Sequence, residues 1–154
     1  MIYDFIFGTN DAYLTFVRHK ESTMINQETI AILDQKNILM TRGYAQGDAE
    51  IIASEYYLED AWVIGPEGGS WVGKDQILAL YESVVGVFTW GTERVHLMET
   101  ADGSISEFLI GTIYPIDEGE QASYKIQLVW TKQGNDWKCA SQFFASGENF
   151  EYAA

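Results

Sequence analysis

The chain is poor in cysteine, proline, histidine and positive charge, and each shortage narrows what the protein can be. Its single cysteine, Cys139, excludes a disulfide within one chain and is compatible with a reducing compartment. Its two histidines, His19 and His96, are far apart in sequence, so we expect no metal and no other cofactor. Nine basic residues against 23 acidic ones give a net charge of −14, which disfavours nucleic acid and anionic lipid as partners.

A run of the ~20 apolar residues that a membrane helix needs is also missing, so we expect no membrane partner. The first residues, MIYDFIFGTNDAYLTFVRHK, contain acids early and have no basic start, which is unlike a signal peptide. We therefore expect a cytoplasmic protein. The chain does contain 47% hydrophobic and 14% aromatic residues over 154 positions, which is typical of one globular domain.

Helix-type patterns fill the first half of the chain, and strand-type patterns fill the second. Helices are expected over about Thr23–Gln46, over about Ala49–Leu58 and from near Lys74 onward. Gly47 suits a C-terminal cap of the first helix, and Asp48 can cap the second. Strands are expected over Ala61–Ile64, Glu93–Thr100, Ser104–Tyr114, Ala122–Lys132 and Asp136–Phe144. Helices followed by an antiparallel meander indicate an α+β fold.

A polar stripe interrupts the apolar face expected for the long first helix. Several apolar residues fall on one broad arc of that helix: Ile30, Ala31, Leu33, Ile38, Met40, Tyr44 and Ala45. Asp34, Asn37 and Thr41 sit inside this arc at spacings of three and four residues. The stripe faces either solvent or a cavity, and the pattern alone leaves both possibilities open.

The order of these signals is similar to that of a known superfamily. The stretch GYAQGDAEIIASEYYLEDAWVIGPEGGSWVGKDQI and the closing hairpin YKIQLVWTKQGNDWKCASQFFASG together resemble the nuclear transport factor 2-like superfamily, also called the cystatin-like cone. The branches most alike are the SnoaL-like polyketide cyclases, the ketosteroid isomerases and the association domain of calcium/calmodulin-dependent kinase II. The resemblance covers roughly residues 24 to 147. We divide the chain into an N-terminal extension, 1–22, and a nuclear transport factor 2-like domain, 23–154.

The resemblance implies a curved antiparallel sheet wrapped around a long N-terminal helix, with two shorter helices. Such a cone leaves an apolar pocket with a few polar groups. The loop GPEGG, residues 65–69, would be a hairpin tip at its mouth. It does not fit a phosphate-binding loop, because Trp71 and Val72 separate the glycines from the next helix and Lys74 is followed by Asp75.

The ketosteroid isomerase branch also implies positions for catalytic groups. Its general base, an aspartate before a proline on this hairpin, corresponds to Gly65. Its oxyanion-hole tyrosine corresponds to Met40, and its oxyanion-hole aspartate falls near Gln127. Glycine and methionine cannot exchange a proton, so we expect no ketosteroid isomerisation by that route.

Other residues can be candidates for acid–base work. His96 can act as an acid or a base and is expected to share a strand face with Arg94 and Met98. It can equally be a half-buried or exposed histidine without such a role. Glu107 shares its face with apolar residues, so it is either a pocket acid or a carboxylate at a wet strand end. Asp34 of the helix stripe is the third catalytic candidate.

Further residues are candidates for binding a small apolar or amphipathic molecule: Asn37, Thr41, Tyr57, Trp62, Tyr114, Gln127 and Gln142. The amides can orient a polar ligand or satisfy one another, and the aromatic residues can form pocket walls or ordinary core. The first hypothesis is therefore a pocket protein, with an enzyme of the cyclase, isomerase or dehydratase kind as one form of it.

The alternative hypothesis is a non-enzymatic homodimeric association module. The predicted strands contain more large apolar residues than a sheet can expose to solvent on both faces. These residues are Phe108, Ile110, Tyr124, Leu128 and Trp130. Pairing of two copies would cover such a face. The two hypotheses are compatible, since a dimer can still hold a pocket.

Overall fold

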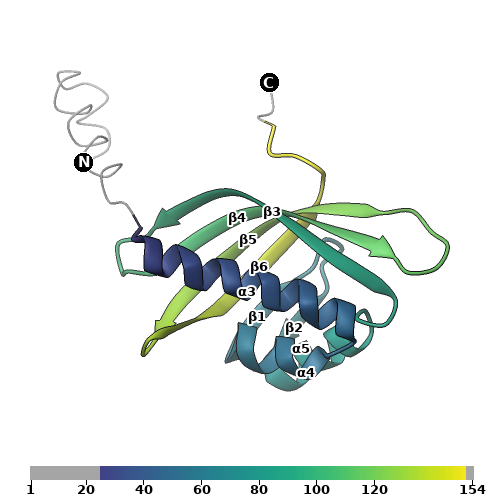
Figure 1. Cartoon of the computed structure of the whole chain (residues 1–154), viewed down its shortest axis with the longest axis horizontal. Helices are drawn as coiled ribbons and strands as arrows, with labels where there is room; N and C mark the ends of the chain where they lie inside the picture. The colour runs from purple at the N-terminus through teal and green to yellow at the C-terminus, as the bar shows by residue number, and fades with distance from the viewer. Residues whose placement is uncertain (1–24, 152–154) are drawn as a thin grey trace.

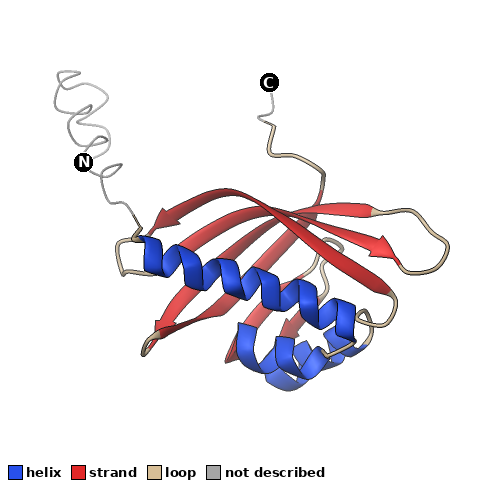
Figure 2. Ribbon diagram, in the orientation of Figure 1, coloured by secondary structure: helices blue, strands red, loops and turns tan. Residues whose placement is uncertain are grey.

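In the computed structural model, which describes residues 25–151, three helices and a π-helical turn lie against one side of a curved sheet (Figures 1 and 2). The helical segments are α3 (Gln27–Gln46), α4 (Ala49–Ile51), the turn η1 (Ile52–Tyr56) and α5 (Lys74–Glu82). Helix α3 crosses the concave side of the sheet, while α4 and α5 gather at one end (Figure 1). The expected extension, residues 1–22, lies outside the described residues.

Six strands form the sheet: β1 (Tyr57–Ile64), β2 (Ser70–Val72), β3 (Phe88–Glu99), β4 (Ile105–Pro115), β5 (Ala122–Gln133) and β6 (Asp136–Ser146). Their order is β2-β1-β6-β5-β4-β3. All neighbours are antiparallel except β1 and β6, which run parallel. The expected α+β fold with a curved sheet around a long helix is confirmed, and one parallel pair makes the sheet mixed.

Local capping explains where the helices begin and end. The Asn26 side chain accepts a hydrogen bond from the Thr29 amide at 2.8 Å, so α3 begins at Gln27 rather than near Thr23. Gly47 takes the left-handed conformation, with φ of 69°, and ends α3 as expected. Asp48 accepts from the Ile51 amide at 3.0 Å and caps α4 as expected.

The second helical segment is shorter than expected. Its last turn is π-helical, and Tyr57 already begins β1. Two lysines satisfy the carbonyl oxygens that this helix end leaves free: Lys36 Nζ donates to the Glu55 oxygen at 2.7 Å, and Lys138 Nζ to the Ser54 oxygen at 2.8 Å. These bonds hold the turn against α3 and β6.

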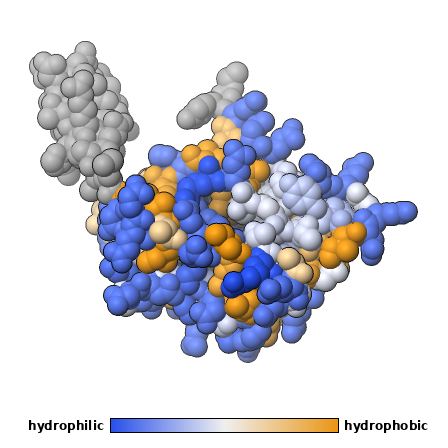
Figure 3. All heavy atoms as spheres, in the orientation of Figure 1, coloured by the Kyte–Doolittle hydropathy of each residue, from blue (hydrophilic) through white to orange (hydrophobic). Residues whose placement is uncertain are grey.

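The inward face of α3 is narrower than the expected arc. Leu33, Met40 and Tyr44 are buried against the sheet, whereas the Ile38 side chain is 52% exposed. Hydrophilic residues dominate the visible surface of the molecule over α3, with hydrophobic residues between them (Figure 3). None of the described helices combines the length and apolar character needed to cross a membrane.

A bulge in β3 reverses which side chains face the core. Arg94 and His96 pair with successive residues of β4, so Val95 has no partner of its own. Arg94 therefore points to the helix side, while His96 lies on the outer face, with its ring centroid 6.3 Å from that of Phe108. The expectation that Arg94, His96 and Met98 share one face is wrong, because the bulge inserts one extra residue into the alternation.

Candidate functional site

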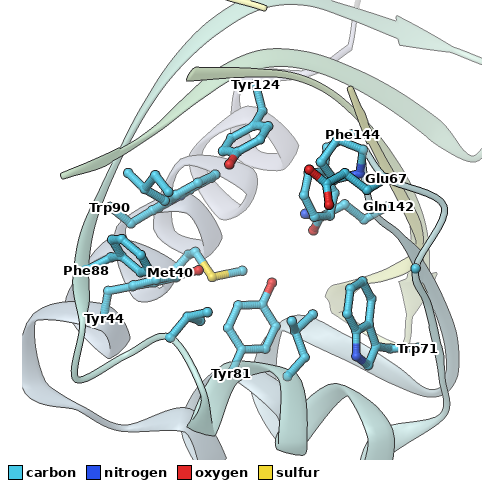
Figure 4. A pocket seen from close by; sticks show the side chains of 16 residues that line it. Met40, Tyr44, Glu67, Trp71, Tyr81, Phe88, Trp90, Tyr124, Gln142 and Phe144 are labelled. Carbon is cyan, nitrogen blue, oxygen red and sulfur yellow. The ribbon is translucent and has the colours of Figure 1, made fainter. Parts of the chain in front are cut away.

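A cavity of about 570 Å³ opens at the end of the cone where α3, α5 and the β1–β2 loop meet the sheet (Figure 4). The volume lies within the range of small-molecule sites. Helix α5 supplies Leu80 and Tyr81, and the turn that follows it supplies Val84. The β1–β2 loop supplies its rim, including Glu67.

Aromatic side chains form a large part of the cavity wall. Seven aromatic side chains, here called the aromatic wall, line it: Tyr44, Trp71, Tyr81, Phe88, Trp90, Tyr124 and Phe144. Tyr44 stacks on Trp90 with ring centroids 5.6 Å apart and an interplanar angle of 16°. Tyr124 meets Phe144 edge to face, with centroids 5.5 Å apart. Figure 4 shows these rings surrounding the cavity from several elements.

A buried chain of hydrogen bonds forms one polar part of the wall. Tyr57 Oη lies 2.5 Å from Gln142 Oε1 and 2.5 Å from Tyr81 Oη. Because Tyr57 has one hydroxyl proton and donates it to Gln142, Tyr81 donates to Tyr57. The Tyr81 oxygen therefore keeps accepting capacity, and the Gln142 Nε2 amide group keeps its donors, at residues that line the cavity.

The phenol groups of this region are uncharged. Burial raises the pKa of Tyr44, Tyr57 and Tyr81 well above the ordinary phenol value, so all three remain protonated at neutral pH. Glu67 is the one ionic side chain among the described residues that line the cavity. The Trp90 indole N–H, which is buried, has no hydrogen-bond partner within the described part of the chain. These groups give an apolar cavity a small number of polar contacts.

A second polar cluster lies under α3, apart from this cavity. The fully buried Glu107 carboxylate accepts from Asn37 Nδ2, Arg94 Nε and Trp130 Nε1, each at 2.8 Å. Arg94 Nη1 also reaches Asp34 at 2.5 Å. Glu107 thus has a positive partner and three donors, which is how a buried charge is accommodated in a core.

The predicted site residues divide into three groups in space. Tyr57 and Gln142 meet at the cavity wall, and only Gln142 of the two lines it. Glu107, Asn37 and Asp34 form the cluster under α3. Both Asn37 and Thr41 also border a shallow groove between α3 and β3.

The remaining predicted residues lie away from the cavity, which corrects the expectation that they line it. His96 and Gln127 are exposed on the outer face of the sheet, with Gln127 paired to Phe108. Trp62 and Tyr114 are 52% and 45% exposed. Successive side chains of a strand point to opposite faces of the sheet, and each of these four residues points to the outer face.

The slots implied by the ketosteroid isomerase branch fall partly at the cavity. Gly65 and Met40 both line it, so two of the three corresponding positions border the space but carry no acid or phenol. Gln127 does not, because it faces outward. The carboxylate that does reach the cavity, Glu67, sits two positions beyond Gly65 on the same loop.

Sequence reasoning missed Glu67 and most of the aromatic wall. The sequence predicts this loop at the mouth of the pocket, and Glu67 is the one acid in residues 65–69, so that placement is the signal that could have identified it. The aromatic wall has no such signal, because its rings come from six separate elements and have no common spacing in the sequence. Within residues 25–151, no group of three or more His, Cys, Asp and Glu side chains is arranged to hold a metal ion.

No protein-family model and no curated protein matches this sequence. A domain of unknown function with a cystatin-like fold from Nostoc punctiforme is similar in structure, with a TM-score of 0.69 and 15% identity, over 81% of each chain. A ketosteroid isomerase-like protein from Erwinia carotovora atroseptica has a TM-score of 0.65 and 18% identity, over 81% of this chain and 100% of that one. An NTF2-like protein from Cytophaga hutchinsonii has a TM-score of 0.59 and 17% identity, over 79% of this chain and 99% of that one.

These likenesses identify the class of fold as the cystatin-like α+β cone. The nuclear transport factor 2-like protein shares this fold, which the resemblance in the sequence implied. At such identities the likeness concerns the fold alone.

Proposed function

We propose that the protein binds a small apolar or amphipathic molecule in the cavity of the cone. The observation that carries this proposal is a cavity of about 570 Å³ whose lining includes the seven rings of the aromatic wall. Gln142 and Tyr81 supply hydrogen bonds that orient a guest, and Glu67 supplies a negative charge at the rim. A few directional groups in an apolar wall are typical of ligand sites.

Binding, rather than catalysis by the residues first considered, is the function that the geometry supports. His96 lies on the outer face, and Glu107 and Asp34 are engaged by Arg94. A general acid or base must come within hydrogen-bond reach of its substrate. If the protein is an enzyme of the isomerase or dehydratase kind, Glu67 is the carboxylate placed to move a proton.

Filling the cavity tests the proposal. The probe is N-phenyl-1-naphthylamine, a neutral dye that fluoresces in apolar surroundings. We expect saturable binding by the native chain, and an affinity at least about tenfold lower after Leu80→Phe with Val84→Phe, since both side chains line the cavity. Val87→Phe is the control, because Val87 is 51% exposed and does not line the cavity. Undiminished binding by the filled variant would place the dye elsewhere and contradict the proposal.

A homodimer through the outer face of the sheet is the second candidate function, and an exposed apolar surface favours it. Trp62 and Phe143 are 52% and 53% exposed on the neighbouring strands β1 and β6. Gln127 of β5 pairs with Phe143 on one side and with Phe108 of β4 on the other, so these three residues form one row across the sheet. We call Trp62, Phe108 and Phe143 the outer apolar face. Of the residues first named for this role, Tyr124, Leu128 and Trp130 face inward, so that part of the expectation is wrong.

Sedimentation velocity tests the dimer. The native chain is expected to sediment as a dimer at micromolar concentration, and Phe143→Lys is expected to weaken the association at least about tenfold by placing a charge in an apolar contact. Ile38→Lys makes the same change at a side chain of matching exposure, 52%, on α3. A native chain that sediments as a monomer would rule the dimer out, as would equal effects of the two variants.

A further inference from the structure

The charge around the cavity has one sign. Glu67 carries the one charge among the described residues that line it, and no lysine, arginine or histidine is among them. The buried phenols of Tyr44, Tyr57 and Tyr81 are neutral, and the whole chain carries a net charge of −14. An anionic guest would meet repulsion at the mouth, whereas a cation would be attracted to it.

Aromatic rings favour the same sign of charge. The face of an aromatic ring is its electron-rich side, so a cation placed over it is attracted to the ring. The aromatic wall presents seven such rings to one cavity, with two indoles among them. A neutral guest also gains binding free energy by burying apolar surface against these rings. The cation–π attraction contributes further binding free energy only when the guest is positively charged.

The rim brings a ring and the carboxylate to the same side of the cavity. The loop rests on the Trp71 indole, because a Cβ at Gly69 would lie 2.9 Å from its ring and one at Gly65 would lie 3.1 Å from it. The two glycines therefore allow a contact that larger residues would prevent. Figure 4 shows Glu67 and Trp71 on one side of the cavity, opposite Tyr44, Phe88 and Trp90.

We propose that the cavity selects an organic cation, namely an amphipathic amine or quaternary ammonium compound with a flat apolar body. The charged head lies by Glu67 and Trp71, and the apolar body lies against Phe88, Trp90 and Tyr44 on the opposite side. This inference rests on the proposed ligand-binding function and adds the chemical class of the ligand.

Two compounds of the same shape test the role of charge. (Naphthalen-2-ylmethyl)trimethylammonium and its carbon isostere 2-neopentylnaphthalene differ by one positive charge, and each is measured by displacement of N-phenyl-1-naphthylamine. The cation is expected to bind about tenfold more tightly, and its advantage is expected to shrink as salt rises. A neutral isostere that binds as well as the cation, or better, would overturn the inference.

Two glutamate variants test the position of the charge. Glu67→Gln is expected to reduce several-fold the ratio of the cation's affinity to that of the neutral isostere. Glu99→Gln changes the net charge equally at the far end of β3, about 30 Å along the strand from Trp90, and is expected to keep the advantage. Equal losses in the two variants would assign the effect to overall charge and contradict a site at Glu67.

The outcomes of these experiments distinguish a failure of the cation preference from a failure of the proposed ligand-binding function. Dye binding that survives in the filled variant, or no dye binding at all, removes the proposed function and this inference together. Dye binding that is lost in the filled variant, combined with no preference for the cation, removes only the choice of ligand class.

Discussion

Replacing Glu107 by alanine is expected to lower the free energy of unfolding by about 3–5 kcal/mol, because it breaks a buried ion pair. The carboxylate is fully buried and accepts from Asn37, Arg94 and Trp130. Without it, Arg94 loses its buried counter-charge, and the indole N–H of the fully buried Trp130 loses its acceptor. Urea denaturation followed by circular dichroism measures the loss.

Asp34→Ala is the matched control for this prediction. Asp34 and Glu107 bind the same guanidinium, but the Asp34 side chain is 50% exposed and that of Glu107 is 0% exposed. Water can replace the exposed partner, so the expected loss is below about 1 kcal/mol. If the two variants lost equal stability, burial would not be what makes Glu107 important. A Glu107→Ala variant as stable as the native chain would show that this carboxylate is not needed for stability, and Glu107 would again be a candidate for acid–base catalysis.

Replacing Gly111 by alanine is expected to destabilise the protein by about 1–3 kcal/mol and to weaken dye binding. A Cβ at this position would lie 2.2 Å from the Trp90 ring and 2.6 Å from the Ile126 side chain. Trp90 cannot retreat freely, because Tyr44 stacks on it. The displaced ring belongs to the aromatic wall, so the stability and the shape of the cavity should change together. Thermal denaturation and titration with N-phenyl-1-naphthylamine measure the two effects.

Gly91→Ala makes the same chemical change one strand away. There the added Cβ would meet Tyr114 at 3.5 Å, which is an ordinary contact. Neither glycine has a positive φ, so backbone strain does not distinguish the two positions. The change at Gly91 is expected to stay within about 0.5 kcal/mol of the native stability. A Gly111→Ala variant as stable as Gly91→Ala, with unchanged dye binding, would show that Trp90 can move without cost.

The parts of the fold that local chemistry decides could be predicted from the sequence. Gly47 and Asp48 fix a helix junction through their own backbone and side-chain preferences. The sequence predicts that the second helix continues to about Leu58, whereas β1 begins at Tyr57. Tyr56 and Tyr57 are both aromatic and both buried, so neither the helical nor the strand periodicity of apolar residues shows which of them ends the helical segment. Long-range pairing, rather than any local signal, makes Tyr57 a strand residue.

The candidate site was less predictable, because the side to which a strand residue points depends on register. A single bulge at Val95 sent His96 outward and Arg94 inward. Gln127 and Gln142 are both amides on strands, yet one is exposed and the other lines the cavity. A residue's type gives its chemistry, while its neighbours across the sheet decide whether a ligand can reach it.

The parallel pairing of β1 with β6 affects the order in which the protein folds. β6 is the last of the described strands, whereas β1 precedes the meander from β3 to β6, so the two meet only after a large loop has closed. Such distant contacts are formed late and slowly, while the hairpins from β3 to β6 join sequence neighbours. During synthesis on the ribosome, β1 can pair with β6 only after β6 has emerged. The hollow that would hold a guest is therefore among the last features of the molecule to take shape.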